Sequence, residues 1–176
     1  MAVTINGSAG VTTNVGAVYN GIQASTAVAS TSGTSIDFTG IPSWVKRITV
    51  MFNGVSTSGT SNYQVQIGSG SVDTTGYACS GTLMVNATPT SFGNVTTGFI
   101  VNTAGIATSF MCGTLTLTSV GSNIWVGVAV LTDNSSARCF YSAGNKTLGG
   151  ALDRVRITTV NGTDTFDAGS INILYE

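Results

Sequence analysis

Few side chains in this sequence can perform acid–base or nucleophilic chemistry. The 176 residues contain no His, and six basic and seven acidic residues give a net charge of −1. General acid–base catalysis near neutral pH usually relies on His or on paired carboxylates. Without His, neither a Ser–His–Asp nor a Cys–His nucleophile can be assembled. We therefore expect no catalytic residues and a protein that is not an enzyme.

Asp164 and Asp167 are the one close pair of carboxylates, and they lie in the segment Gly162–Gly169. Such a pair could hold Ca²⁺ or act as the two carboxylates of a glycosidase. Asp in a segment rich in Gly and Thr is equally typical of a turn, in which the side chain accepts backbone hydrogen bonds. We expect the turn, and no metal.

The three cysteines, Cys79, Cys112 and Cys139, match no metal-binding spacing and have no His to complete a site. An odd number of cysteines also argues against a full disulfide framework. We expect buried, reduced thiols in a protein made in a reducing cytoplasm. The Gly-rich segments lack the phosphate-loop pattern, so the sequence predicts no cofactor.

The aromatic side chains suggest binding instead of catalysis, because a ring with a polar tip can stack on a sugar. The same residue types also fill cores and interfaces. The densest charge cluster, Asp153 to Arg156, is either a ligand or inter-subunit ion-pair site or a solvated strand face. The candidate ligand or interface contacts are Trp44, Tyr63, Tyr77, Trp125 and Tyr141.

Charged residues make up only 7% of the chain, against about 25% in an average soluble domain. The polar surface must consist of Thr, Ser, Asn and Gly, which can pack against other copies of the chain with little charge to desolvate. Without a basic patch, binding to nucleic acid is not expected. No apolar run is long enough to span a bilayer and no leader is visible, so we expect no membrane insertion.

Residues 1–32 differ from the rest of the chain, because they carry no charge and show no sustained periodicity. We interpret them as an extended N-terminal arm or attachment segment; a disordered tail is the alternative. The apolar side chains expected to dock on a partner are Val3, Ile5, Val11, Val15 and Tyr19.

Residues 33–176 show the alternation of short strands. About nine or ten strands are expected, and the candidate segments are 35–38, 45–52, 63–67, 77–79, 82–85, 97–101, 107–118, 124–131, 138–142, 154–159 and 170–175. Both faces of 124–131 are apolar, which predicts a central strand. No amphipathic helix of useful length is visible. The expected fold is all-β, an antiparallel, jelly-roll-like β-sandwich head domain over residues 33–176.

Two long segments carry a resemblance to a known family. They are residues 32–70, SGTSIDFTGIPSWVKRITVMFNGVSTSGTSNYQVQIGSG, and residues 142–176, SAGNKTLGGALDRVRITTVNGTDTFDAGSINILYE. Both resemble the C-terminal, receptor-binding head domain of tailed-bacteriophage tail fibres. The resemblance implies a homotrimeric adhesin displayed on the virion surface, which engages a host glycan or protein and has no catalytic residues to transfer.

Two functional interpretations follow from this resemblance. In the first, the chain is a short tail-fibre or tail-tip adhesin head that binds the host surface. In the second, it is a capsid decoration or head-fibre protein, tethered by residues 1–32. Both place it in a virion made in the bacterial host cytoplasm, with tail or capsid proteins as further partners.

Overall fold

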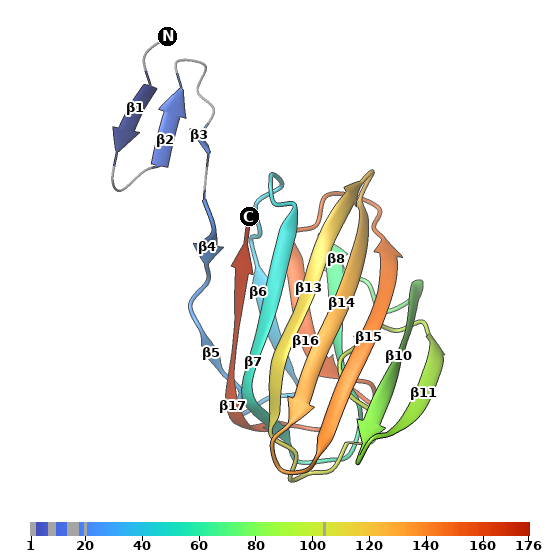
Figure 1. Ribbon diagram of the computed structural model, residues 1–176. Helices are drawn as coiled ribbons and strands as arrows, with labels where there is room; N and C mark the ends of the chain where they lie inside the picture. The colour runs from blue at the N-terminus through green and yellow to red at the C-terminus, as the bar shows by residue number, and fades with distance from the viewer. Residues whose placement is uncertain (1–2, 7–9, 14–17, 20, 104) are drawn as a thin grey trace.

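The computed structural model describes residues 3–6, 10–13, 18–19, 21–103 and 105–176 (Figure 1). These residues form strands and no helix, which confirms the all-β prediction. Consequently, none of them belongs to a helix that could cross a bilayer.

The strands fall into an N-terminal group and a body. The first group is β1 (Val3–Asn6), β2 (Gly10–Thr13), β3 (Val18–Tyr19), β4 (Gln23–Ala24) and β5 (Val28–Ala29). The body contains β6 (Ser35–Thr39), β7 (Arg47–Thr57), β8 (Tyr63–Ser69), β9 (Ser71–Val72), β10 (Tyr77–Val85), β11 (Thr88–Val95), β12 (Phe99–Ile100), β13 (Met111–Gly121), β14 (Ile124–Asp133), β15 (Arg138–Thr147), β16 (Arg154–Thr159) and β17 (Phe166–Tyr175).

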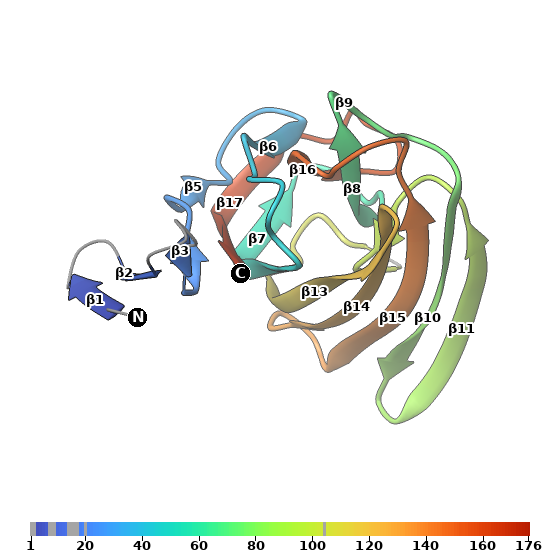
Figure 2. The ribbon, with the colours of Figure 1, turned by 90° about the horizontal axis from the view of Figure 1, so that it is seen from above.

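Two antiparallel sheets make up the body. The large sheet has the order β11-β10-β15-β14-β13-β7-β17-β4, and β5 also pairs with β17. The small sheet has the order β12-β8-β16-β6, with β9 paired to β8. Figure 2 shows the large sheet curving around the small one, so that the two are layered. The expected antiparallel β-sandwich is confirmed.

The core lies between the two sheets and follows from the alternation of side chains along each strand. On β14, Trp125, Ala129 and Leu131 point inward and are buried, and Val155 and Ile157 on β16 face them from the small sheet. Side chains in such an interior pack closely.

The central position of residues 124–131 is confirmed, because β14 lies between β13 and β15. Other strands differ from expectation. β13 begins at Met111 and not at Ala107, since the preceding residues turn with a hydrogen bond from Ser109 N to Ile106 O (2.9 Å). The sequence pattern did not reveal β11, an exposed edge strand that contains Pro89. Pro at an edge is typical of strands that must not pair further.

The N-terminal group joins the body through main-chain hydrogen bonds. β1, β2 and β3 form a three-stranded antiparallel sheet, while β4 and β5 lie along β17. Ser30 is fully buried there, with its amide on Gly169 O (2.9 Å) and its hydroxyl on Ala168 O (2.7 Å). The last part of the expected arm therefore covers the edge strand of the large sheet.

The structure places the docking candidates of the arm only in part. Val3, Ile5, Val11 and Tyr19 lie in β1, β2 and β3, and Val15 lies outside the described residues. Their role in attachment stays a prediction.

Candidate functional site

Three of the five aromatic candidates are core residues, which corrects the sequence-based expectation. Tyr63, Tyr77 and Trp125 expose 4% of their surface or less. A ring enclosed by the sandwich has no face left for a ligand. The strands that carry these residues turn their side chains inward. Alternation in the sequence does not by itself decide which of the two faces of a strand is buried.

The hydroxyl groups of the two buried tyrosines have partners inside the protein. Tyr77 Oη accepts a hydrogen bond from Ile67 N (2.8 Å) and lies 2.9 Å from the carbonyl oxygen of Asp73, to which it donates. Tyr63 Oη accepts one from Thr57 Oγ1 (3.2 Å). Burial raises the pKa of both phenols above the ordinary value, so that they are neutral structural groups.

Trp44 and Tyr141 are the aromatic candidates that reach the surface. Trp44 packs at a tilt against Tyr175, with 6.0 Å between ring centroids. Tyr141 lies on the outer face of the large sheet, where its cross-strand neighbours are Val130 and Thr82. The two rings belong to different parts of the surface and do not share a site.

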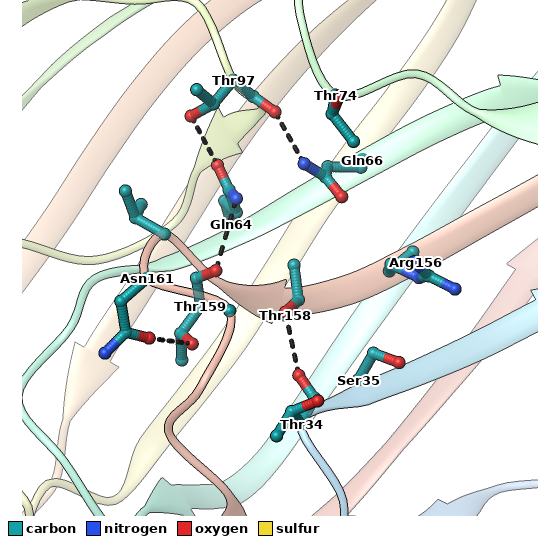
Figure 3. Close-up of a pocket in the computed structure, with 12 residues that line it drawn as sticks. Thr34, Ser35, Gln64, Gln66, Thr74, Thr97, Arg156, Thr158, Thr159 and Asn161 are labelled. Atoms are coloured by element: carbon teal, nitrogen blue, oxygen red, sulfur yellow. Dashed lines mark hydrogen bonds between the residues drawn. The ribbon is translucent and has the colours of Figure 1, made fainter.

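A polar groove on the outer face of the small sheet is the best-formed candidate site (Figure 3). It encloses about 330 Å³, at the lower end of the range for small-molecule pockets, about 300–1,000 Å³. β8 and β16 contribute its floor. The lining residues are mostly hydroxyl or amide residues: Thr34, Ser35, Gln64, Gln66, Thr74, Thr97, Arg156, Thr158, Thr159, Val160, Asn161 and Gly162.

Two buried glutamines hold the floor of the groove in place. Gln64 Oε1 accepts a hydrogen bond from Thr97 Oγ1 (2.7 Å), and Gln64 Nε2 donates to Thr159 O (3.4 Å). Gln66 Nε2 donates to Thr97 O (2.9 Å). Because these amides bridge β8, β16 and the segment before β12, the floor is built from three parts of the chain.

Gln66 has one polar atom left for a ligand. Its residue is 5% exposed, and Oε1 has no hydrogen-bond partner among the residues that the structure describes. Figure 3 shows this oxygen turned away from Thr97, on the side of Thr158 and Arg156. The oxygen itself is not sealed off, because Asn102 Nδ2 is the buried side-chain atom without a hydrogen-bond partner among the described residues; Gln66 Oε1 is open to the groove and free to accept a hydrogen bond from water or from a ligand.

Arg156 is the charged residue of the lining, and its charge is already matched. Arg156 is paired across the strands with Gln66 on one side and with Asp37 on the other. Its Nε and Nη2 donate to the two carboxylate oxygens of Asp37, at 2.7 and 3.1 Å. The second arginine of the expected charge cluster, Arg154, binds Asp153 (2.7 Å). Both ion pairs lie within one chain.

The wall that carries Thr74 is tied to the large sheet by Lys146. Lys146 is 7% exposed; its Nζ lies 2.8 Å from the carboxylate of Asp73 and donates to Thr75 O (2.9 Å). The same ammonium lies 5.2 Å from the ring centroid of Tyr77. One buried cation therefore fixes the loop between β9 and β10.

The expected turn is only partly present: the chain turns at residues 160–162, where Asn161 Oδ1 accepts from the amides of Thr163 and Asp164, and Asp167 lies in β17. The Asp164 carboxylate accepts hydrogen bonds from Ser61 N (2.9 Å) and from Asn161 Nδ2 (2.6 Å). No group of three or more potential metal ligands occurs among the residues with described positions. Cys79, Cys112 and Cys139 are free thiols, of which Cys79 is buried and the other two are half-buried.

A second surface lies opposite the groove, on the outer face of β10, β15, β14, β13 and β7. We call it the uncharged face. Its centre is a row of exposed valines on β14: Val126, Val128 and Val130, which expose 36%, 55% and 47% of their surface. Tyr141 and Met84 continue this apolar centre. The flanking outward residues of β13 are Thr114, Thr116 and Thr118, so that these strands present no charge in the middle of the face.

Sequence reasoning missed the two glutamines. The alternation of Tyr63, Val65 and Ile67 with Gln64 and Gln66 was visible, and it predicts that the glutamines face away from the core. It does not show that another segment folds over them.

Comparisons of this chain with protein-family models, with curated proteins and with solved structures find no match.

Proposed function

We propose that this chain is a non-enzymatic structural protein exposed on a tailed-phage virion, and that it serves as a short tail-fibre or tail-tip adhesin head. The head binds the host surface through the polar groove and assembles as a homotrimer through the uncharged face. The observation that carries the proposal is the groove itself, where Gln66 Oε1 is an acceptor that has no hydrogen-bond partner among the described residues and is open to a ligand.

The chemistry of the groove supports binding without turnover. No carboxylate is part of its lining, and its arginine is engaged by Asp37. Proton transfer at neutral pH needs a group that can gain or lose a proton. Hydroxyl and amide groups instead hold a ligand by hydrogen bonds, which is what an attachment protein requires.

The uncharged face supports self-association, with a second copy of the chain as its occupant. Five strands spaced about 4.8 Å apart, each about ten residues long, present a face of roughly 800 Å². Each partner in a standard-sized interface buries roughly the same area. Contact at the centre of the face would desolvate Val and Thr side chains, while Arg47, at the start of β7, and its partner Glu176 lie at the margin; a centre without charge lowers the cost of assembly.

In a threefold arrangement this face is divided between two neighbours, so each contact would have about half of it, roughly 400 Å² per copy. In a ring, each copy offers two different patches to its neighbours. The part of the face nearer β7 would contact the part nearer β10 of the next copy, with the β14 valines close to the axis. The grooves, on the opposite sheet, would all point outward.

The arm favours a second candidate, a capsid decoration or head-fibre protein. β4 and β5 bind the edge of β17 by main-chain hydrogen bonds, which is the mode by which extended segments attach to sheets. The sheet of β1, β2 and β3 precedes them and offers a separate unit for holding a capsid protein.

Two measurements test the proposal. Purified chain is expected to bind host cells and to compete with intact phage for adsorption, with or without residues 1–32. Quantitative mass spectrometry of virions is expected to find the chain in proportion to tail proteins. Abundance in proportion to the major capsid protein, together with loss of virion binding when residues 1–32 are removed, would favour the decoration role. Failure to bind cells or virions in any form would refute both.

A further inference from the structure

The polar groove has the donor and acceptor pattern of a neutral sugar site. Sugar hydroxyls both donate and accept hydrogen bonds, and so do the Thr and Ser hydroxyls of the lining. Thr74 is exposed at the rim, and its hydroxyl makes no hydrogen bond with the described residues. Together with Gln66 Oε1, it gives a ligand one hydroxyl group and one strong acceptor to bind.

The size of the groove limits the ligand to a small unit. Its volume of about 330 Å³ lies at the lower end of the range for small-molecule sites, about 300–1,000 Å³. A single hexose, with its dozen non-hydrogen atoms, is of this size. A folded partner or a long chain segment would not enter.

The Asp37–Arg156 pair sets the charge of the site. An arginine with free donors would attract a carboxylate or a phosphate and bind it in a bidentate manner. Here Asp37 occupies that bidentate position, at 2.7 and 3.1 Å. The carboxylate of Asp37 offsets the charge of the guanidinium, so an incoming anion would find little net attraction and would meet the negative charge of Asp37.

We propose that the groove binds one neutral, hydroxyl-rich sugar unit, that Gln66 and Thr74 contact it, and that the Asp37–Arg156 pair selects against acidic sugars. This inference rests on the proposed function, because it names the ligand class of the same groove. Without an aromatic ring in the lining, a single site binds weakly, and several copies in one assembly supply the avidity.

The test uses the full chain and sugars of known charge. Saturation-transfer NMR is run with neutral methyl glycosides of glucose, galactose, mannose and N-acetylglucosamine, and with glucuronic acid and N-acetylneuraminic acid. At least one neutral glycoside is expected to bind and neither acid is. Thr74→Val is expected to weaken binding at least threefold, and Gln66→Leu at least tenfold, since the latter leaves a sugar hydroxyl without its acceptor.

The matched control is Thr88→Val, an exposed threonine on β11 far from the groove, which is expected to leave sugar binding unchanged. Circular dichroism and melting temperature check that each variant is folded; should Gln66→Leu fail this check, Thr74→Val decides. Asp37→Asn tests selectivity: it is expected to raise the affinity for glucuronic acid at least tenfold relative to the affinity for the neutral glycosides.

The results separate this inference from the proposed function. If wild-type chain binds acidic sugars as well as neutral ones, or if folded Thr74→Val binds as wild type does, the sugar assignment is wrong. If cells bind the chain but no sugar does, the assignment is also wrong, while the adhesin role stands. If neutral sugars bind but neither cells nor virions do, the groove assignment holds and the adhesin role falls.

Discussion

Arg156 on β16 and Asp37 on β6 form a two-pronged ion pair across neighbouring strands, with Nε–Oδ1 and Nη2–Oδ2 distances of 2.7 and 3.1 Å. Both side chains are about one-third exposed. Exposed pairs add about 0–1 kcal/mol to stability. The pair therefore matters for the electrostatics of the groove more than for the fold.

The first prediction concerns the contribution of the Asp37–Arg156 ion pair to stability. Asp37→Asn is expected to change the free energy of unfolding by about 1 kcal/mol or less, as measured by urea denaturation. The same substitution is expected to change which sugars bind. A loss of several kcal/mol would mean that the pair is a structural element and would argue against a role in selectivity.

The second prediction concerns the buried phenol of Tyr77. Tyr77→Phe removes the acceptor of the Ile67 amide and the donor to the Asp73 carbonyl oxygen. A buried group left unsatisfied costs about 1–3 kcal/mol, and we expect a loss of that size in urea denaturation. Tyr141→Phe is the control, since the Tyr141 side chain is exposed; its effect should stay within about 0.5 kcal/mol. Equal effects of the two changes would contradict the assignment of Tyr77 to the core.

The third prediction concerns Asp133, which is buried at the end of β14. Its carboxylate accepts hydrogen bonds from the hydroxyls of Ser109, Ser135 and Ser136, at 2.7–3.0 Å, and from the backbone amides of Phe110 and Ser135. Burial by itself raises the pKa of Asp133, but the hydrogen bonds from Ser135 and Ser109 outweigh it, so the pKa lies below its ordinary value.

The sign of the pH effect follows from this shift. The unfolded chain takes up the proton at a higher pH than the folded chain. The stabilisation is therefore complete above the ordinary carboxyl pKa, about 4, and is lost as the pH falls through the lower folded pKa. Asp133→Asn is expected to cost about 2 kcal/mol at pH 7 and to flatten the acid limb of stability against pH. Asp167→Asn, at an exposed carboxylate, is the control and should leave that limb in place.

The fourth prediction concerns the uncharged face. Val128 exposes 55% of its surface at the centre of β14. Val128→Lys is expected to leave the monomer folded but to disrupt assembly, because each contact would then bury an unpaired charge. Sedimentation velocity should find wild-type chain at three times the 17.8 kDa of one chain and the variant at one. Ile22→Lys, at an equally exposed apolar residue of the arm, should stay trimeric.

A monomeric wild-type chain at micromolar concentration would refute the proposal that copies of the chain contact one another through this face.

Thiol labelling adds an independent measurement. Cys139 is half-buried at the end of the face, whereas Cys79 is in the core. Cys139 should react with the thiol reagent more slowly in the wild-type chain than in the Val128→Lys variant. Cys79 should react in neither protein.

The fifth prediction concerns the connection of the arm to the body. Ser30→Ala removes the hydroxyl that donates to Ala168 O from a fully buried position. We expect a loss of about 1 kcal/mol and faster hydrogen exchange along β17. Ser32→Ala, at an exposed serine of the same segment, should have no such effect. If Ser30→Ala also leaves β17 unchanged, the arm does not stabilise that edge.

Alternation in the sequence predicts most of the body, because a sandwich turns every second side chain inward. It locates β8, β14, β16 and the last part of β17 within a few residues, but it ends β7 at Phe52, whereas the strand continues through Gly54 to Thr57. Its failure at β11 has a physical reason: a strand exposed on both faces has no hydrophobic period, and its Pro and Gly residues resemble a loop.

The site was less predictable than the fold. Aromatic residue type cannot distinguish a ring such as Tyr77, held in the core by a hydroxyl with internal partners, from an exposed ring such as Tyr141. The groove depends on Gln66, Thr97 and Arg156, which lie far apart in the sequence and meet only through strand register and a covering segment. Register over such distances is not contained in local periodicity.

Lys146 has a thermodynamic consequence for whatever enters the groove. Its bonds to Asp73 and Thr75 fix the loop that carries Thr74 when the protein folds. The entropy cost of ordering this loop is therefore part of folding and does not oppose ligand binding. Occupancy should then follow ligand concentration without a slow closing step, with association and release both rapid. Under the proposed adhesin function, a particle that carries several heads would bind a cell surface stably only where several grooves are occupied at once.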